Sequence, residues 1–168
     1  TYYYSRPHMA AQGTLKVGDD VRPVTGTGWF DHQWGDLEEA TELGWDWFAI
    51  SLDDGRKIMA FTVHAQTGDQ MVGGSVTGPD CVTRELKPQE FKASATGEWT
   101  SPESACVWRV GWSVEVAGMK LKLVPVIDDQ EVFNSKTPTK SYWEGAVRVE
   151  GDATGRAYVE LAGCVTGT

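Results

Sequence analysis

The stretch that decides the fold reads Val-Trp-Arg-Val-Gly-Trp-Ser-Val-Glu-Val over residues 107–116. Apolar side chains stand at every second position, and smaller or polar groups lie between them. This period of two is typical of a β-strand that buries one face. Ala117 and Gly118 then predict a hairpin turn, and the alternation resumes over residues 119–123 with both lysines pointing outward. The region is therefore predicted to be an antiparallel strand pair.

The same pattern recurs along the chain. Two further hairpins are predicted, one from residues 44–52 and 57–64 around the turn 53–56, the other from residues 142–150 and 156–162 around the turn 151–155. Shorter strand candidates cover residues 13–17, 20–23 and 85–95, and the one plausible helix covers residues 36–43. Strands joined by tight turns, without a helix between them, predict an all-β antiparallel barrel with at most one short helix.

Length and charge restrict the possible functions. A chain of 168 residues suits a single domain, here residues 1–168. The net charge of −9 disfavours nucleic acid and anionic membrane surfaces as partners. The sequence contains no run of about 18 apolar residues, so no membrane-spanning segment is predicted. Thr1 already opens strand-like sequence, so we expect no signal peptide in this chain, and both a secreted and a cytoplasmic location stay open.

Aromatic residues and cysteines leave alternatives open. Eight Trp and nineteen Gly fit a turn-rich β protein, whose rings either line a ligand cavity or fill the barrel. Cys81, Cys106 and Cys164 lack the spacing of a metal site. Three buried thiols are expected, although one internal disulfide is possible.

The densest polar and aromatic cluster covers residues 28–36. Asp31 and His32 could each carry a proton near neutral pH, with the neighbouring indoles excluding water. On an extended strand Asp31 and Gln33 share one face, while His32 and Trp34 share the other. A histidine that faces into a barrel could be a general acid, and a histidine in a tryptophan corner could equally be structural.

Two further carboxylates lie between aromatic residues. If Asp46 points inward with Phe48 and Ile50, burial should raise its pKa and keep it protonated at neutral pH. If it points outward, it is a solvated strand residue. Glu144 shares a predicted face with Tyr142 and Arg148, and an ion pair with Arg148 would lower its pKa and make it structural.

Several classes of site are not supported by the sequence. The histidines are far apart and no carboxylate–histidine spacing resembles a metal site, so we predict no metal site. The nucleophile elbow of a serine hydrolase, the P-loop and the dinucleotide fingerprint are also absent.

Three blocks of sequence are the most specific, namely Trp-Phe-Asp-His-Gln-Trp-Gly at 29–35, Gly-Trp-Asp-Trp-Phe at 44–48 and Tyr-Trp-Glu-Gly at 142–145. Weaker blocks lie at 2–5, 13–15, 52–55, 99–102, 129–131 and 158–163. In this order the blocks resemble the second half of the AttH/CrtC-like lipocalin family, which includes carotenoid hydratases, kievitone hydratase and fungal Diels-Alderases. Cys164 departs from the pattern, because the family usually ends this block with Gly-Tyr. The resemblance implies a lipocalin-like, calycin-type barrel that corresponds to the C-terminal half of a two-domain protein.

The family also implies cofactor-free chemistry on apolar isoprenoid or polyene molecules. Its Asp-His-x-Trp block carries over to Asp31, His32 and Trp34, and Asp46 and Glu144 are the alternative acids. Aromatic residues that could bind substrate and stabilise a carbocation are Trp29, Trp34, Trp45, Trp47, Tyr142, Trp143 and Tyr158. A second lipocalin-like domain or chain could complete the site.

Three functions follow as hypotheses. The leading one is a hydratase that protonates a C=C bond and adds water. The second is a pericyclase, a Diels-Alderase-type cyclase of secondary metabolism that folds a polyene and needs shape more than a strong acid. The third is a lipocalin-like protein that binds a hydrophobic ligand without changing it.

Overall fold

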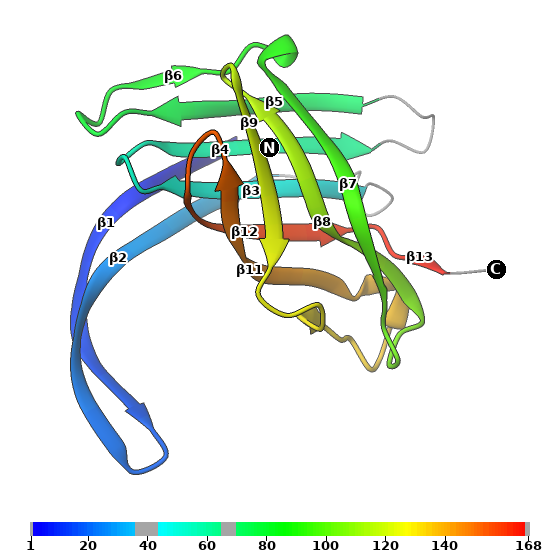
Figure 1. The fold of residues 1–168 in the computed structure, drawn as a ribbon. Helices are drawn as coiled ribbons and strands as arrows, with labels where there is room; N and C mark the ends of the chain where they lie inside the picture. The colour runs from blue at the N-terminus through cyan, green and yellow to red at the C-terminus, as the bar shows by residue number, and fades with distance from the viewer. Residues whose placement is uncertain (1, 36–43, 65–69, 167–168) are drawn as a thin grey trace. The chain divides into compact units, whose positions relative to one another are not determined.

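The computed structural model describes residues 2–35, 44–64 and 70–166, and these are almost entirely β-strand (Figure 1). Two short 3-10 turns, η2 (Pro88–Glu90) and η3 (Pro138–Lys140), interrupt them. The strands are β1 (Tyr2–Val17), β2 (Asp20–Trp34), β3 (Gly44–Leu52), β4 (Lys57–His64), β5 (Gln70–Thr77), β6 (Thr83–Glu85), β7 (Phe91–Thr100), β8 (Cys106–Val116), β9 (Met119–Pro125), β10 (Glu131–Val132), β11 (Tyr142–Gly151), β12 (Gly155–Ala162) and β13 (Val165–Thr166). The helix expected at residues 36–43 lies outside the described residues.

The chain separates into two compact units, residues 1–38 and residues 39–168. The first unit is an antiparallel hairpin of the long strands β1 and β2, which turn at Gly18 and Asp19. Sequence periodicity predicted this turn, but it predicted the two strands only over residues 13–17 and 20–23, next to the turn. The strands continue to Tyr2 and Trp34, so the cluster at residues 28–34 lies on β2.

The second unit is one antiparallel sheet that curls into a half-barrel, which confirms the lipocalin-like, all-β fold. Its main path runs β6-β5-β4-β3-β12-β11-β9-β8, and β7 continues the sheet beyond β8. The short strand β13 pairs with the start of β8, and β10 pairs with β11. Nearly every neighbour in this order is also close in sequence, as the predicted hairpins require.

The inner face of the curled sheet carries the hydrophobic core. Alternate residues of the quoted stretch, among them Trp108, Trp112 and Val116, are buried there, as the period of two predicted. Phe48 of β3 lies 5.2 Å from Trp112 and 5.6 Å from Phe91 between ring centroids, so strands far apart in the sheet meet across its interior. Much of the interior is therefore filled by side chains.

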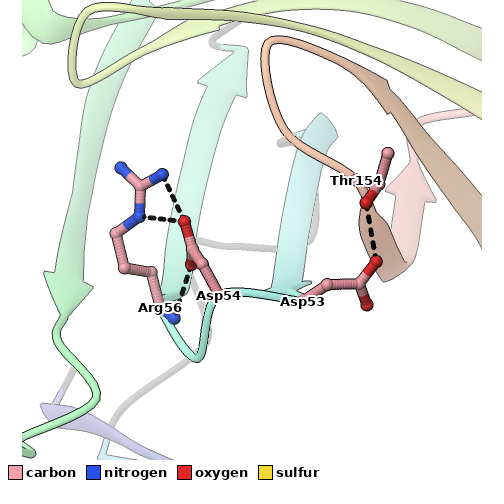
Figure 2. Close-up of polar contacts among 4 residues, drawn as sticks. All are labelled: Asp53, Asp54, Arg56 and Thr154. Carbon is pink, nitrogen blue, oxygen red and sulfur yellow. Dashed lines mark hydrogen bonds and ion pairs between the residues drawn. The ribbon is translucent and has the colours of Figure 1, made fainter.

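Two predicted turns fix the ends of the hairpins. Ala117 and Gly118 have φ values of 49° and 81°, the paired positive values of a tight hairpin turn. In the turn after β3, Asp54 accepts hydrogen bonds from the backbone N–H and the guanidinium of Arg56, which lower the pKa of that carboxyl (Figure 2). Thr154 Oγ1 donates to Asp53 Oδ2 over 2.7 Å and thereby joins this turn to the one between β11 and β12.

A disulfide corrects the expectation of three buried thiols. Cys106 at the start of β8 is bonded to Cys164, with 5.3 Å between the two Cα atoms, and Cys81 is free and exposed. The two half-cystines meet because β13, directly after Cys164, pairs with Cys106 and Val107. Because the two cysteines are 58 residues apart, the local sequence pattern gave no indication of this pairing.

Candidate functional site

A small cavity lies within the second unit, between β3, β4, β5, β7 and β8. Its volume is about 230 Å³, below the roughly 300–1,000 Å³ of pockets for drug-sized ligands. Asp46, Thr62, Phe91 and Trp112 line it and are buried. Gln70, Lys92 and Arg109 line it and are exposed, so they form its rim. The cavity therefore admits a small molecule or one end of a larger one.

A carboxyl–imidazole pair lines the cavity, with Asp46 buried and His64 partly exposed. Asp46 Oδ2 and His64 Nε2 are 2.7 Å apart, and Gln70 Nε2 lies 3.4 Å from the other ring nitrogen of His64. Because either the carboxyl or the imidazole can hold the proton between them, the pair can both donate and accept a proton. Such a pair is a candidate for general acid–base chemistry.

Asp46 points inward, which is the first of the two orientations that the sequence left open. It alternates with the outward Trp45 and Trp47 on β3 and shares the inner face with Phe48 and Ile50. Burial raises its pKa, and the hydrogen bond to His64 and the charges of His64 and Arg109 offset part of that rise. The carboxyl thus holds its proton to higher pH than an exposed aspartate does.

Sequence reasoning missed His64, which it treated only as one of three scattered histidines. The signal was in the predicted hairpin itself. In the β3–β4 ladder Asp46 lies opposite Thr62, so His64 is the diagonal neighbour of Asp46 on the same face. Diagonal neighbours lie within reach of long side chains. The rim residues Lys92 and Arg109 and the cavity wall at Trp112 were likewise not assigned to a site.

Asp31 and His32 lie on β2, in the hairpin unit. As predicted, they point to opposite faces of the strand, and each has its own partners. Asp31 Oδ1 accepts a hydrogen bond of 2.9 Å from Trp29 Nε1. His32 stacks on Tyr4 at 5.8 Å and meets the edge of Trp34 at 5.1 Å. The hairpin therefore does not join Asp31 and His32 in one proton-transfer pair.

The face of His32 is a continuous aromatic surface. Tyr2 stacks on Trp34 at 5.5 Å, and Phe30 lies 6.1 Å from Tyr4 and 6.2 Å from His32. Cross-strand register explains the cluster, because Tyr2 pairs with Trp34 and Tyr4 pairs with His32. Paired rings of this kind stabilise a hairpin and also present polarizable faces to a ligand.

Glu144 lies on the outer face of the curled sheet. The inward residues of β11 are Trp143, Gly145 and Val147, so Glu144 faces away from the core that contains Asp46. It lies opposite Glu160 in the β11–β12 ladder, and burial together with that charge raises its pKa. Arg148 lies instead 4.0 Å from Glu150, so the structural ion pair considered for Glu144 does not form.

The remaining aromatic candidates are divided between the outer face and the core. Trp47 lies opposite Glu160, and Trp45 Nε1 donates to Glu160 Oε1 over 2.9 Å. Tyr142 and Tyr158 share this outer face with Glu144, and burial and the nearby carboxylates raise the pKa of both phenols. Trp143 is fully buried and donates to the backbone oxygen of Asp128 over 2.7 Å. Of the predicted site residues, Asp46 alone lines the cavity described above.

Within the described residues, no group of three or more His, Cys, Asp or Glu side chains could hold a metal ion. The same part of the chain contains no helix long and apolar enough to cross a membrane.

Comparison with known proteins places these features in context. The model of the AttH-like family matches residues 1–164. A crystal structure of a protein described as an AttH from Nitrosomonas europaea is similar with a TM-score of 0.83 and 32% identity, over 98% of this chain and 52% of that one. Kievitone hydratase from Nectria haematococca is similar with a TM-score of 0.77 and 18% identity, over 96% of this chain and 52% of that one. No curated protein matches. The chain thus spans about half the length of these two relatives.

Proposed function

The chain belongs to the AttH-like family, and from this premise we propose that it is a cofactor-free hydratase, which adds water to a C=C bond of a small, largely apolar molecule. The observation that carries the proposal is the Asp46–His64 pair in the wall of the cavity. The fold shared with kievitone hydratase agrees with a hydratase-type lipocalin. In this account Asp46 is the acid and His64 its proton-transfer partner.

The reaction requires one proton and one water molecule. Protonated Asp46 transfers its proton to the less substituted alkene carbon, and the π electrons form the new C–H bond and leave a tertiary cation. The oxygen of water then forms the C–O bond to that cation. The surplus proton of the water returns to the Asp46–His64 pair. One water molecule is consumed, the acid is regenerated, and no oxidant or reductant is needed.

The environment of Asp46 suits this role. An acid that protonates an alkene must still hold its proton near neutral pH, and burial raises the pKa of Asp46 in that direction. Phe91 and Trp112 give the cavity aromatic walls, which can stabilise a passing cation by about 1–2 kcal/mol when desolvated. Glu144 lies on the opposite face of the sheet, so it could not act on the same bound molecule.

Incubation in H₂¹⁸O tests the reaction class. We expect the protein to convert a prenylated phenol to a tertiary alcohol that carries one ¹⁸O atom. Mass spectrometry of the product and a parallel incubation without protein provide the measurement and its control. A cyclised product without label would favour the pericyclase, and a ligand that binds but is recovered unchanged would favour a binding protein. Either result would contradict the hydratase.

A further inference from the structure

The rim of the cavity carries two cationic side chains, of which Lys92 lies opposite Glu115 in the β7–β8 ladder and Arg109 acts by its charge on Asp46. Lys92 and Arg109 both line the cavity and are exposed. In the described part of the chain, neither takes part in an ion pair within 4.0 Å. Asp46 is the one carboxylate among the residues known to line the cavity, and it is bonded to His64. In a protein with a net charge of −9, two such cations beside one small cavity require a reason.

We infer that the ligand of this cavity carries a carboxylate, which binds at the rim beside Arg109 and Lys92 while its apolar tail enters toward Phe91 and Trp112. Hydration of the bound ligand rests on the proposed function, in which the double bond of the tail lies near Asp46. Arginine recognises a carboxylate through charge-assisted hydrogen bonds that a neutral amide cannot replace. Among the small unsaturated molecules of the proposed function, the preferred substrate is accordingly a short unsaturated carboxylic acid, and a neutral alkene such as a prenylated phenol binds more weakly.

The charge of the ligand would also support the acid. A carboxylate bound at the rim adds a negative charge near Asp46 and partly neutralises Arg109, whose charge lowers the pKa of Asp46 in the free protein. Both effects favour the protonated form of Asp46. The ligand therefore strengthens the protonation state that hydration needs.

Paired ligands of equal shape test the inference. Isothermal titration calorimetry would compare geranate, a ten-carbon acid with two double bonds, with its neutral amide. We expect the wild-type protein to bind geranate about tenfold more tightly than the amide. Arg109→Gln should bring the affinities for acid and amide to within about twofold of each other, and Lys92→Gln should reduce the preference by a smaller factor. Arg148→Gln, on the outer face, is the matched control and should retain the preference.

Three outcomes would overturn the inference: equal affinity for acid and amide, no binding of geranate, or a preference that survives Arg109→Gln. Incorporation of ¹⁸O into a bound ligand is measured separately. Acid preference without incorporation would contradict the hydratase and leave the carboxylate site standing. Incorporation without acid preference would contradict only the carboxylate site.

Discussion

At the scale of single residues, the proposed chemistry depends on the protonation state of Asp46. Its side chain exchanges solvation by water for one bond to His64 and a largely buried environment. A carboxyl with a raised pKa is less stable as an anion in the folded protein than in the unfolded chain. Asp46 should therefore be an acid at the cost of some folding stability.

This cost predicts a pH-dependent effect of Asp46→Asn on stability. Because the folded-state pKa of Asp46 is raised, the contribution of Asp46 to wild-type stability should fall as pH rises from about 4, the unfolded value, through the folded value. Asparagine does not titrate, so the variant should gain in Tm relative to the wild type across that window. Thermal unfolding at a series of pH values measures the difference. A difference in Tm that is constant with pH would contradict the raised pKa.

Glu131 is a second carboxylate whose surroundings indicate its role, which is structural. It accepts hydrogen bonds from Ser101 Oγ, from Ser104 Oγ and, over 2.7 Å, from Trp108 Nε1. These bonds tie β10 to the segment between β7 and β8. The sequence indicated only a weak family block at residues 129–131, because the three donors come from residues more than twenty positions away.

We therefore expect Glu131→Ala to destabilise the fold by about 2–4 kcal/mol, since it leaves the buried indole N–H of Trp108 without an acceptor. Urea unfolding measures the change. Glu115→Ala, at an exposed position of β8, serves as the matched control and should change stability by less than about 0.5 kcal/mol. Equal effects of the two substitutions would show that the bonds to Glu131 contribute little.

At the scale of elements, the strand pairings that the sequence could predict are those within hairpins. The turns at 18–19, 53–56, 117–118 and 151–155 join strands that are adjacent in sequence, and their glycines and alternating faces are local signals. Pairings between distant segments, such as β12 with β3 and β13 with β8, have no local signal. The disulfide and the placement of Arg109 near Asp46 depend on those pairings, which explains why both were missed.

The disulfide gives a prediction at this scale. It closes a loop of 58 residues and holds the end of the described chain against β8. By chain-entropy arguments its removal should cost up to about 4 kcal/mol. Replacement of both Cys106 and Cys164 by Ser should lower Tm, and a reductant should lower the Tm of the wild-type protein but not that of the double variant. Cys81→Ser should have no effect. An unchanged Tm of the wild-type protein in reductant would contradict a stabilising bond.

At the scale of the whole molecule, the candidate residues are divided between two units. Asp46 and its cavity belong to the curled sheet, while the Asp-His-x-Trp block belongs to the hairpin. Since Asp31 and His32 face opposite sides of β2, the block supplies an aromatic surface with one imidazole and no paired acid. The family resemblance identified both regions and put Asp31, His32 and Trp34 first, with Asp46 as an alternative acid; the ranking proposed here is the reverse. That ranking depended on the burial of Asp46 and its contact with His64.

This division predicts unequal effects on turnover. His32→Gln should lower the rate of hydration by less than about 10²-fold, the lower limit of a typical general acid, because its role is limited to the aromatic surface. Asp31→Asn, which retains an acceptor oxygen for Trp29, should have a smaller effect. Rates measured with a saturating prenylated phenol would test both. Loss of all activity in His32→Gln would transfer the acid role to the hairpin.

The most direct test is the rate of hydration in Asp46→Asn, beside Asp54→Asn on the exposed turn. The measurement is formation of the ¹⁸O-labelled tertiary alcohol, with near-ultraviolet circular dichroism to verify that both variants are folded. Asp46→Asn should reduce the rate by about 10²–10⁴-fold, and Asp54→Asn should leave it unchanged. A folded Asp46→Asn protein that hydrates its substrate at the wild-type rate would contradict the assignment of Asp46 as the acid.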